Sequence, residues 1–170
     1  VILVIGGSLG SVIVNNAVRE ALPELLNKFQ FIHLCGKGKT DESLNGTKGY
    51  CQFEYIKDEL RDIFALADIV ISRAGANAIC ELLALRKPNL LIPLSAKASR
   101  GDQILNARSF ERQGFSMVIE EENLSKDSLL QAVQHLYDNR STFMDAMRNS
   151  GQQDSIDTII GLIKEAADHN

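Results

Sequence analysis

The turn Gly6-Gly7-Ser8-Leu9-Gly10-Ser11 has a composition that suits phosphate binding. Glycines let a backbone approach an anion closely, and a helix that follows directs free N–H groups toward it. Ser8 stands where the dinucleotide fingerprint G-x-G-x-x-G needs a glycine, so the turn does not favour a nicotinamide-dependent dehydrogenase. It predicts contact with some phosphate through Gly7, Ser8 and Gly10, and the alternative is a tight turn without a ligand.

A second segment, Arg73-Ala74-Gly75-Ala76-Asn77-Ala78-Ile79-Cys80-Glu81, opens a predicted helix with small residues. The N-terminus of a helix favours anions, so this segment provides a second place that suits an anion. Glu81 lies about one turn further on, where a carboxylate can accept two hydrogen bonds from a vicinal diol such as a ribose. An exposed surface glutamate is the alternative.

The third segment is Ser99-Arg100-Gly101-Asp102-Gln103. Adjacent carboxylate and amide groups suit a sugar with several hydroxyls, although Asp102 could also be a favourable charge at a helix start. Each of the three segments follows a predicted strand. Together they point to a ligand with phosphate, ribose and sugar parts, which is a nucleotide sugar.

Other polar features are interpreted as structural. Gly38-Lys39-Thr40 resembles the end of a Walker A loop, but His33 stands where that loop needs its first glycine. We interpret 36–39 as a flexible turn, His33 as a core histidine and Glu120-Glu121-Glu122 as a solvated turn. The three cysteines form no C-x-x-C pair, so neither a disulfide framework nor a zinc site is expected.

Alternating strand and helix patterns position these segments. Unbroken apolar runs are typical of central parallel strands, because helices cover both faces of such a sheet. Strands are predicted over 1–5, 31–35, 50–56, 68–72, 90–92 and 116–119. Two helices are predicted to end near Leu26 and Leu85, and two more are predicted over 58–67 and 102–112, the latter with Gly114 as its C-cap. A further helix is predicted to begin at Ser125. An apolar stripe follows near the C-terminus at Ile156, Ile159, Ile160 and Ile163. The order predicts an α/β fold, a Rossmann-like parallel sheet flanked by helices, with ligands at the carboxyl ends of the strands.

Length and composition agree with one globular domain. The chain has 170 residues, of which 45% are apolar and 24% charged, and a net charge of −4. This mild acidity argues against a nucleic-acid-binding protein, and no apolar run is long enough to span a membrane. The chain begins within a predicted core strand at Val1, so we expect a fragment of a longer protein, and a processed terminus is the alternative.

The three segments carry a family resemblance over essentially all 170 residues. Gly6-Gly7-Ser8-x-Gly10, the run from Ser72 to Glu81 and the run from Arg100 to Ala107 resemble the C-terminal, donor-binding half of bacterial family 28 glycosyltransferases. These enzymes have two Rossmann-like domains of the GT-B type, and they transfer N-acetylglucosamine from UDP-GlcNAc to lipid I (undecaprenyl-pyrophosphoryl-MurNAc-pentapeptide), which gives lipid II for peptidoglycan synthesis.

The resemblance implies a role for each matching residue. Ser8 and the adjoining backbone, Gly7 and Gly10 included, would contact the diphosphate, and the Ile56 backbone would bind uracil. Residues 75–78 would hold the α-phosphate, Glu81 the ribose, and Asp102 and Gln103 the GlcNAc hydroxyls. This chain has Asp102 where many members have Gln, and Ala78 where some have Thr, so the sugar contact of Asp102 and a hydroxyl contact to phosphate are in doubt.

The implied activity is an inverting, metal-independent transfer without a cofactor. The acceptor lipid and the catalytic base would belong to an N-terminal domain, so the fragment alone is expected to bind UDP-GlcNAc and transfer little or nothing. The full-length enzyme would lie in the cytoplasm at the inner face of the bacterial membrane, with peripheral contact only. A stand-alone nucleotide-sugar-binding subunit with a separate membrane partner, or half of a UDP-GlcNAc 2-epimerase, are the alternatives.

Overall fold

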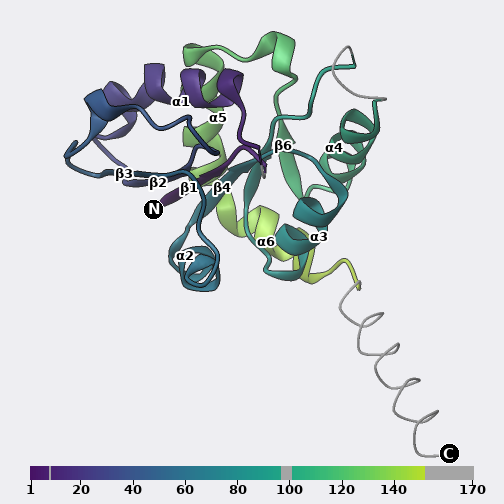
Figure 1. The fold of residues 1–170 in the computed structure, drawn as a ribbon. Coiled ribbons are helices and arrows are strands. Elements are labelled where there is room, and N and C mark those ends of the chain that lie inside the picture. The colour runs from purple at the N-terminus through teal and green to yellow at the C-terminus, as the bar shows by residue number, and fades with distance from the viewer. Residues whose placement is uncertain (8, 97–100, 152–170) are drawn as a thin grey trace, which may run out of the picture.

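The computed structural model describes residues 1–7, 9–96 and 101–151, which form one parallel sheet covered by helices (Figure 1). Within these residues the sheet has six strands in the order β3-β2-β1-β4-β5-β6. The strands are β1 (Ile2–Ile5), β2 (Phe31–Leu34), β3 (Tyr50–Phe53), β4 (Ile69–Ser72), β5 (Asn89–Leu91) and β6 (Ser116–Val118). The helices are α1 (Val12–Leu25), α2 (Leu60–Leu66), α3 (Ala76–Ala84), α4 (Asp102–Arg112), α5 (Lys126–Asp138) and α6 (Arg140–Arg148), with short 3₁₀ turns η1 (Glu42–Leu44) and η2 (Glu121–Asn123).

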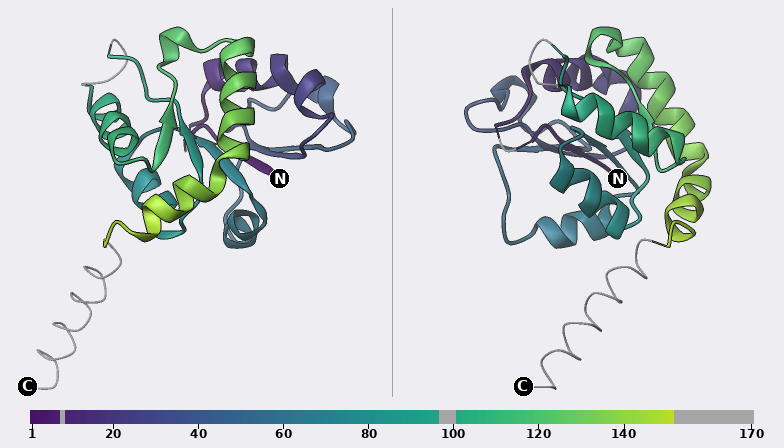
Figure 2. Two further views of the ribbon diagram at one scale, coloured as in Figure 1. Left: turned by 180° about the vertical axis from the view of Figure 1, so that it is seen from behind. Right: turned by 90° about the vertical axis from the view of Figure 1, so that its right-hand side faces the viewer.

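Two apolar layers hold the helices on opposite faces of the sheet. Successive side chains of a strand point to opposite faces, so Ile2 and Val4 of β1 join one layer and Leu3 joins the other. Helices α1 and α5 pack on the first layer, and α2, α3 and α4 pack on the second (Figure 2). All strand pairs are parallel, so the carboxyl ends of the strands meet at one edge.

The strand order reverses between β1 and β4. The chain leaves β1 through α1 on one face, and it leaves β4 through α3 on the other. The two connections therefore diverge at the position where open α/β sheets bind their ligands. The first two segments singled out in the sequence flank this reversal.

The fold class expected from the sequence is confirmed, with differences in detail. Strand β3 ends at Phe53 rather than at 56, because it is an edge strand whose following residues are exposed. The expected loop 40–49 contains η1, which the Asp41 side chain caps. Gly114 follows α4 with φ +74°, as expected of a C-cap glycine. The stripe from Ile156 to Ile163 lies outside the described residues.

No helix in the described part of the chain is both long and apolar enough to cross a lipid bilayer.

Candidate functional site at the carboxyl edge of the sheet

The glycine turn connects β1 to α1 and leaves part of its backbone open. The Gly10 N–H donates to the Gly7 carbonyl at 3.0 Å, which closes the turn. Ser11 caps α1 by accepting a hydrogen bond from the Val14 N–H at 3.3 Å. Gly7 is exposed, has φ +89° and has no atom within 4 Å of the position of a Cβ. An anion can therefore approach the turn at Gly7, and Ser8 lies outside the described residues.

Gly10 serves packing within the protein. A Cβ at Gly10 would lie 1.9 Å from the Cys35 carbonyl oxygen, and φ is +68°. The backbone after β2 therefore crosses directly against the turn, and only glycine fits. The composition of the turn thus has two causes, since Gly10 allows this crossing and Gly7 faces open space.

Residues 36–39 form a turn, as expected from the sequence, and this turn is tied to the glycine turn. Lys39 Nζ donates to the carbonyl oxygens of Leu9 at 2.6 Å and Gly10 at 3.2 Å. Arg19 in turn donates to the Lys39 carbonyl at 2.6 Å. The sequence shows the Gly-Lys-Gly-Lys run at 36–39 but does not show that Lys39 contacts the glycine turn. We call this contact of Lys39 with Leu9 and Gly10 the Lys39 tether.

A buried chain of hydrogen bonds leads from His33 to the Cys35 carbonyl, which lies against the glycine turn. His33 is fully buried; its Nδ1 lies 2.9 Å from the Tyr50 hydroxyl and its Nε2 lies 3.0 Å from Asn15 Oδ1. Asn15 Nδ2 donates to the Cys35 carbonyl at 2.9 Å, so its Oδ1 must accept from His33 Nε2–H, and the Tyr50 hydroxyl donates to Nδ1. Burial, together with the nearby charge of Arg19, lowers the pKa of His33 to about 3. The interpretation of His33 as a core histidine is confirmed.

The second segment gives α3 an N-terminus without a side-chain cap. Gly75 is the N-cap residue, and Ile79 N–H makes the bond to its carbonyl at 3.0 Å. The N–H groups of Ala76, Asn77 and Ala78 precede this first helical bond and have no partner within the helix. The first turn carries no acidic side chain, so its positive dipole end is not compensated from within α3.

Glu81 lies on the side of α3 that faces α2, and Ile56 lies in the loop before α2. Glu81 is exposed and borders a hollow of about 540 Å³ between α2 and α3, together with Leu60 and Arg61. Ile56 is half-buried in the loop before α2 and packs on the same apolar layer. The residues expected to contact uracil and ribose thus lie in the loop before α2 and on α3, respectively.

The third segment begins α4. Asp102 is exposed in the first turn, and Gln103 is half-buried with Oε1 accepting a hydrogen bond from the Leu94 N–H at 3.1 Å. Asn106 Nδ2 donates to the Ala74 carbonyl at 3.1 Å, which joins α4 to the turn before α3. Ser99 and Arg100, which complete this segment, lie outside the described residues.

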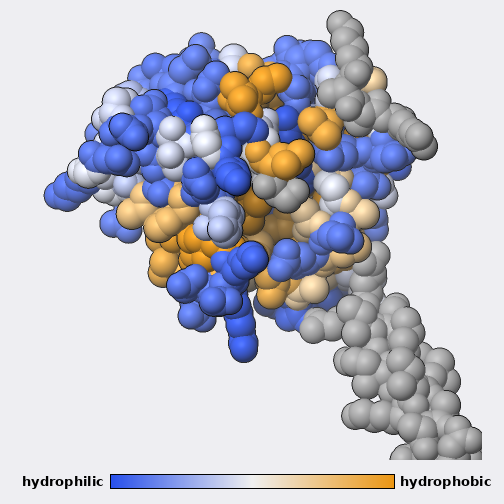
Figure 3. Space-filling view, in the orientation of Figure 1, coloured by the Kyte–Doolittle hydropathy of each residue, from blue (hydrophilic) through white to orange (hydrophobic). Residues whose placement is uncertain are grey.

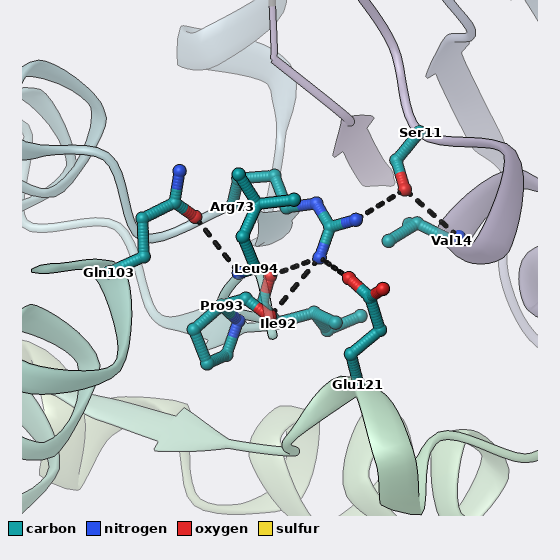
Figure 4. Close-up of polar contacts among 8 residues, drawn as sticks. All are labelled: Ser11, Val14, Arg73, Ile92, Pro93, Leu94, Gln103 and Glu121. Atoms are coloured by element: carbon teal, nitrogen blue, oxygen red, sulfur yellow. Dashed lines mark hydrogen bonds and ion pairs between the residues drawn. The ribbon is translucent and has the colours of Figure 1, made fainter. Parts of the chain in front are cut away.

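Arg73 lies at the centre of this edge, buried to 8% exposure (Figure 4). Its Nη1 lies 2.5 Å from Glu121 Oε2 and donates to the carbonyls of Ile92 at 3.0 Å and Pro93 at 3.2 Å. Its Nη2 donates to Ser11 Oγ at 2.6 Å. Arg73 belongs to the second segment of the sequence, but no role was predicted for it there. A cation between a buried strand and a turn of small residues needs a counter-charge, and this is the sequence signal that indicates a partner.

The expectation of a solvated turn at 120–122 is wrong for Glu121. The Glu121 side chain is only 10% exposed because it neutralises buried Arg73, and Glu120 pairs with Arg108 at 2.6 Å. Exposed Glu122 alone fits the expectation. Among the described residues no group of three or more His, Cys, Asp or Glu side chains is arranged to hold a metal ion.

The surface beside the glycine turn is partly apolar. Leu9, Val12 and Ile13 are 82%, 56% and 48% exposed, and Figure 3 shows separate apolar patches on the otherwise hydrophilic face seen in Figure 1.

Comparison with known proteins places this geometry in a family. The model of the glycosyltransferase family 28 C-terminal domain matches residues 1–159. The UDP-N-acetylglucosamine–N-acetylmuramyl-(pentapeptide) pyrophosphoryl-undecaprenol N-acetylglucosamine transferase of Lachnoclostridium phytofermentans is 67% identical over 165 residues, which are 97% of this chain and 46% of that protein. The protein of the same name from Clostridium tetani is 56% identical, with 97% and 46% covered. The chain thus spans about half the length of the curated relatives it matches.

Solved structures show the same fold at low sequence identity. MurG of Acinetobacter baumannii superimposes with a TM-score of 0.71 at 23% identity, covering 96% of this chain and 49% of that one. The glycosyltransferase VinC, in complex with dTDP, gives a TM-score of 0.67 at 15% identity, covering 99% and 41%. The Rossmann-like sheet expected for the C-terminal half of a GT-B glycosyltransferase is confirmed, and the chain belongs to the family of glycosyltransferase family 28 C-terminal domains.

Proposed function

We propose that this chain binds UDP-GlcNAc at the carboxyl edge of its sheet and is the donor-binding half of an inverting N-acetylglucosaminyltransferase. The observation that carries the proposal is the pair of helix N-termini on either side of the strand-order reversal. The turn before α1 exposes Gly7, and α3 begins at Gly75 without a side-chain cap. Two such termini provide N–H groups and positive dipole ends for a diphosphate.

The remaining parts of the donor fit the flanking residues. In this proposal the Ile56 backbone contacts uracil and the exposed Glu81 carboxylate accepts hydrogen bonds from both ribose hydroxyls. Asp102 and Gln103 contact the GlcNAc hydroxyls. Gln103 Oε1 is held by the Leu94 N–H, which leaves the amide NH₂ group directed away from Leu94 and able to donate (Figure 4). Ser8 would contact the diphosphate beside Gly7.

In the proposed reaction, this chain accelerates the transfer by stabilising the UDP leaving group. When the acceptor hydroxyl attacks the anomeric carbon from the face opposite to UDP, the bond to the diphosphate oxygen breaks and negative charge grows on UDP. Fixed dipoles of α1 and α3 stabilise that charge without reorganising, as preorganised donors do at oxyanion sites. No divalent cation is required by this scheme.

The names of the relatives support a lipid-linked acceptor. We propose lipid I as the acceptor, bound with the catalytic base by an N-terminal domain of the complete enzyme at the inner face of the bacterial membrane. The product would serve peptidoglycan synthesis. This chain by itself would then bind the donor and transfer little or no sugar.

Titration calorimetry with UDP-GlcNAc, UDP-GalNAc and UDP-glucose tests the donor assignment. We expect UDP-GlcNAc to bind more tightly than UDP-GalNAc, because the two differ only in the configuration of the 4-hydroxyl, one of the groups that the third segment would contact. UDP-glucose, which has a hydroxyl in place of the 2-acetamido group, shows whether that group is recognised as well. Equal affinity for all three sugars would remove Asp102 and Gln103 from the sugar site. Failure of UDP itself to bind would overturn the proposed function.

A further inference from the structure

We propose that Arg73 is a positioning residue, which fixes the three donor-binding segments relative to one another with Glu121 as its counter-charge and does not itself bind the donor phosphates. This inference rests on the proposed function for its ligand, and it concerns a residue to which the family resemblance assigned no role.

The acceptors around Arg73 already use its guanidinium. Nη1 faces Glu121 Oε2 and the carbonyls of Ile92 and Pro93, and Nη2 donates to Ser11 Oγ. The side chains of Arg73 and Glu121 are 9% and 10% exposed. A buried charge is stable only when it is paired and hydrogen-bonded, so pulling the guanidinium toward an external phosphate would leave the Glu121 carboxylate buried without its cation.

The contacts of Arg73 reach all three segments. It is part of the turn that leads into α3. Through Ser11 Oγ, which also accepts from the Val14 N–H, it reaches the N-cap of α1. Through the carbonyls of Ile92 and Pro93 it holds the end of β5, and the next residue, Leu94, donates to Gln103 in α4. Figure 4 shows these contacts converging on one side chain.

Substituting the counter-charge separates positioning from direct binding. Glu121→Gln keeps the side-chain shape and removes the charge, and Glu122→Gln makes the same charge change on an exposed neighbour. If Arg73 positions the segments, Glu121→Gln weakens UDP binding roughly tenfold, the equivalent of about one charged hydrogen bond. Uridine, which lacks the phosphates, binds as before, and Glu122→Gln changes neither affinity. If Arg73 bound phosphate directly, release from Glu121 would strengthen UDP binding, and that result would overturn the proposal.

Arg73→Lys gives a second, independent variant. Lysine keeps the positive charge but cannot hold several acceptors in a planar fork. The positioning role predicts that UDP affinity falls about as much as in Glu121→Gln, with uridine unaffected. Retention of wild-type UDP affinity in Arg73→Lys would contradict it, because charge alone would then suffice.

Amide hydrogen exchange tests the positioning role of Arg73 even if UDP does not bind. The Val14 amide bonds to Ser11 Oγ at the end of the proposed chain, and the Ser128 amide bonds to Ser125 Oγ in the capping box of α5. Glu121→Gln should speed exchange at Val14 roughly fivefold, as a local loss of about one hydrogen bond would, while Ser128 stays unchanged. Unchanged exchange at Val14 would overturn the positioning role, whereas absence of UDP binding by the unsubstituted chain would overturn only the proposed function.

Discussion

At the scale of single residues, Gly7 and Gly10 of the same turn are glycines for different structural reasons. Gly10 faces the Cys35 carbonyl so closely that a Cβ would lie 1.9 Å from the oxygen, whereas Gly7 faces open space. Both have positive φ, so both alanine variants carry backbone strain of roughly 1–2 kcal/mol. Gly10→Ala adds a backbone clash and should lose about 3–5 kcal/mol of unfolding free energy in urea. Gly7→Ala should lose only the strain, and equal losses would show that the turn can move away from Cys35.

His33 predicts a pH dependence of stability. Its pKa is about 3 in the folded chain against an ordinary value of 6.5, because burial disfavours the imidazolium. Between these values the unfolded chain binds a proton that the folded chain does not. The stabilising contribution is therefore complete above pH 6.5 and is lost as the pH falls toward 3. Between pH 6.5 and 5 we expect a loss of about 2 kcal/mol in unfolding free energy.

Two variants assign that slope to one histidine. His33→Gln removes the titrating group, so urea midpoints should become nearly level between pH 6.5 and 5. His135 is exposed on α5, and His135→Gln should keep the wild-type slope. A slope that persists in His33→Gln would show that other groups cause it.

Glu81 offers a residue-scale test of the ribose assignment. A charged acceptor contributes roughly 1.5–3 kcal/mol to a hydrogen-bonded contact, so Glu81→Gln should weaken UDP binding by at least tenfold in calorimetry. Wild-type chain should also bind UDP more tightly than deoxy-UDP, which lacks the 2′-hydroxyl. That preference should vanish in Glu81→Gln, and its survival would place the ribose elsewhere.

At the scale of elements, local patterns predicted the strands and most helices, and long-range contacts explain the failures. The largely apolar stretch 68–72 predicts a strand, because helices cover both faces of a parallel sheet and both sides of its strands are therefore apolar. Ser125 was expected to cap a helix and does so within a capping box. Glu121 was misread because its partner Arg73 lies 48 positions away in the chain, and an acidic run by itself is typical of solvent. The Lys39 tether spans 30 positions to Leu9 and is equally invisible locally.

That tether makes a prediction about two neighbouring turns. Lys39 Nζ donates to two carbonyls of the glycine turn, so Lys39→Met should remove these hydrogen bonds and lower the unfolding free energy by about 1–2 kcal/mol. UDP affinity should fall as well, because the turn before α1 loses its fixed shape. Lys37→Met, a substitution at an exposed position of the same run, is the matched control in both measurements. Equal effects of the two substitutions would mean that only net charge matters.

At the scale of the whole molecule, an acidic protein is proposed to bind an anion. The net charge is −4, so long-range attraction cannot be the source of affinity for a diphosphate. The attraction must be local, and the topology supplies it where β1 and β4 lead into helices on opposite faces. Arg73 adds no net positive charge there, because Glu121 neutralises it. The local attraction then comes from the backbone dipoles at α1 and α3, with the Lys39 ammonium beside the glycine turn.

If backbone dipoles suffice, a divalent cation is dispensable for binding the donor. Calorimetric titration of the chain with UDP-GlcNAc should give the same affinity, within about twofold, in EDTA and in excess Mg²⁺. A bound cation would compete with the helix N-termini for the same diphosphate oxygens and would not add to their attraction. A rise in affinity of tenfold or more on adding Mg²⁺ corresponds to about 1.4 kcal/mol. Such a rise would mean that the dipoles leave much of the ligand's charge uncompensated, and the metal-independent scheme would be wrong.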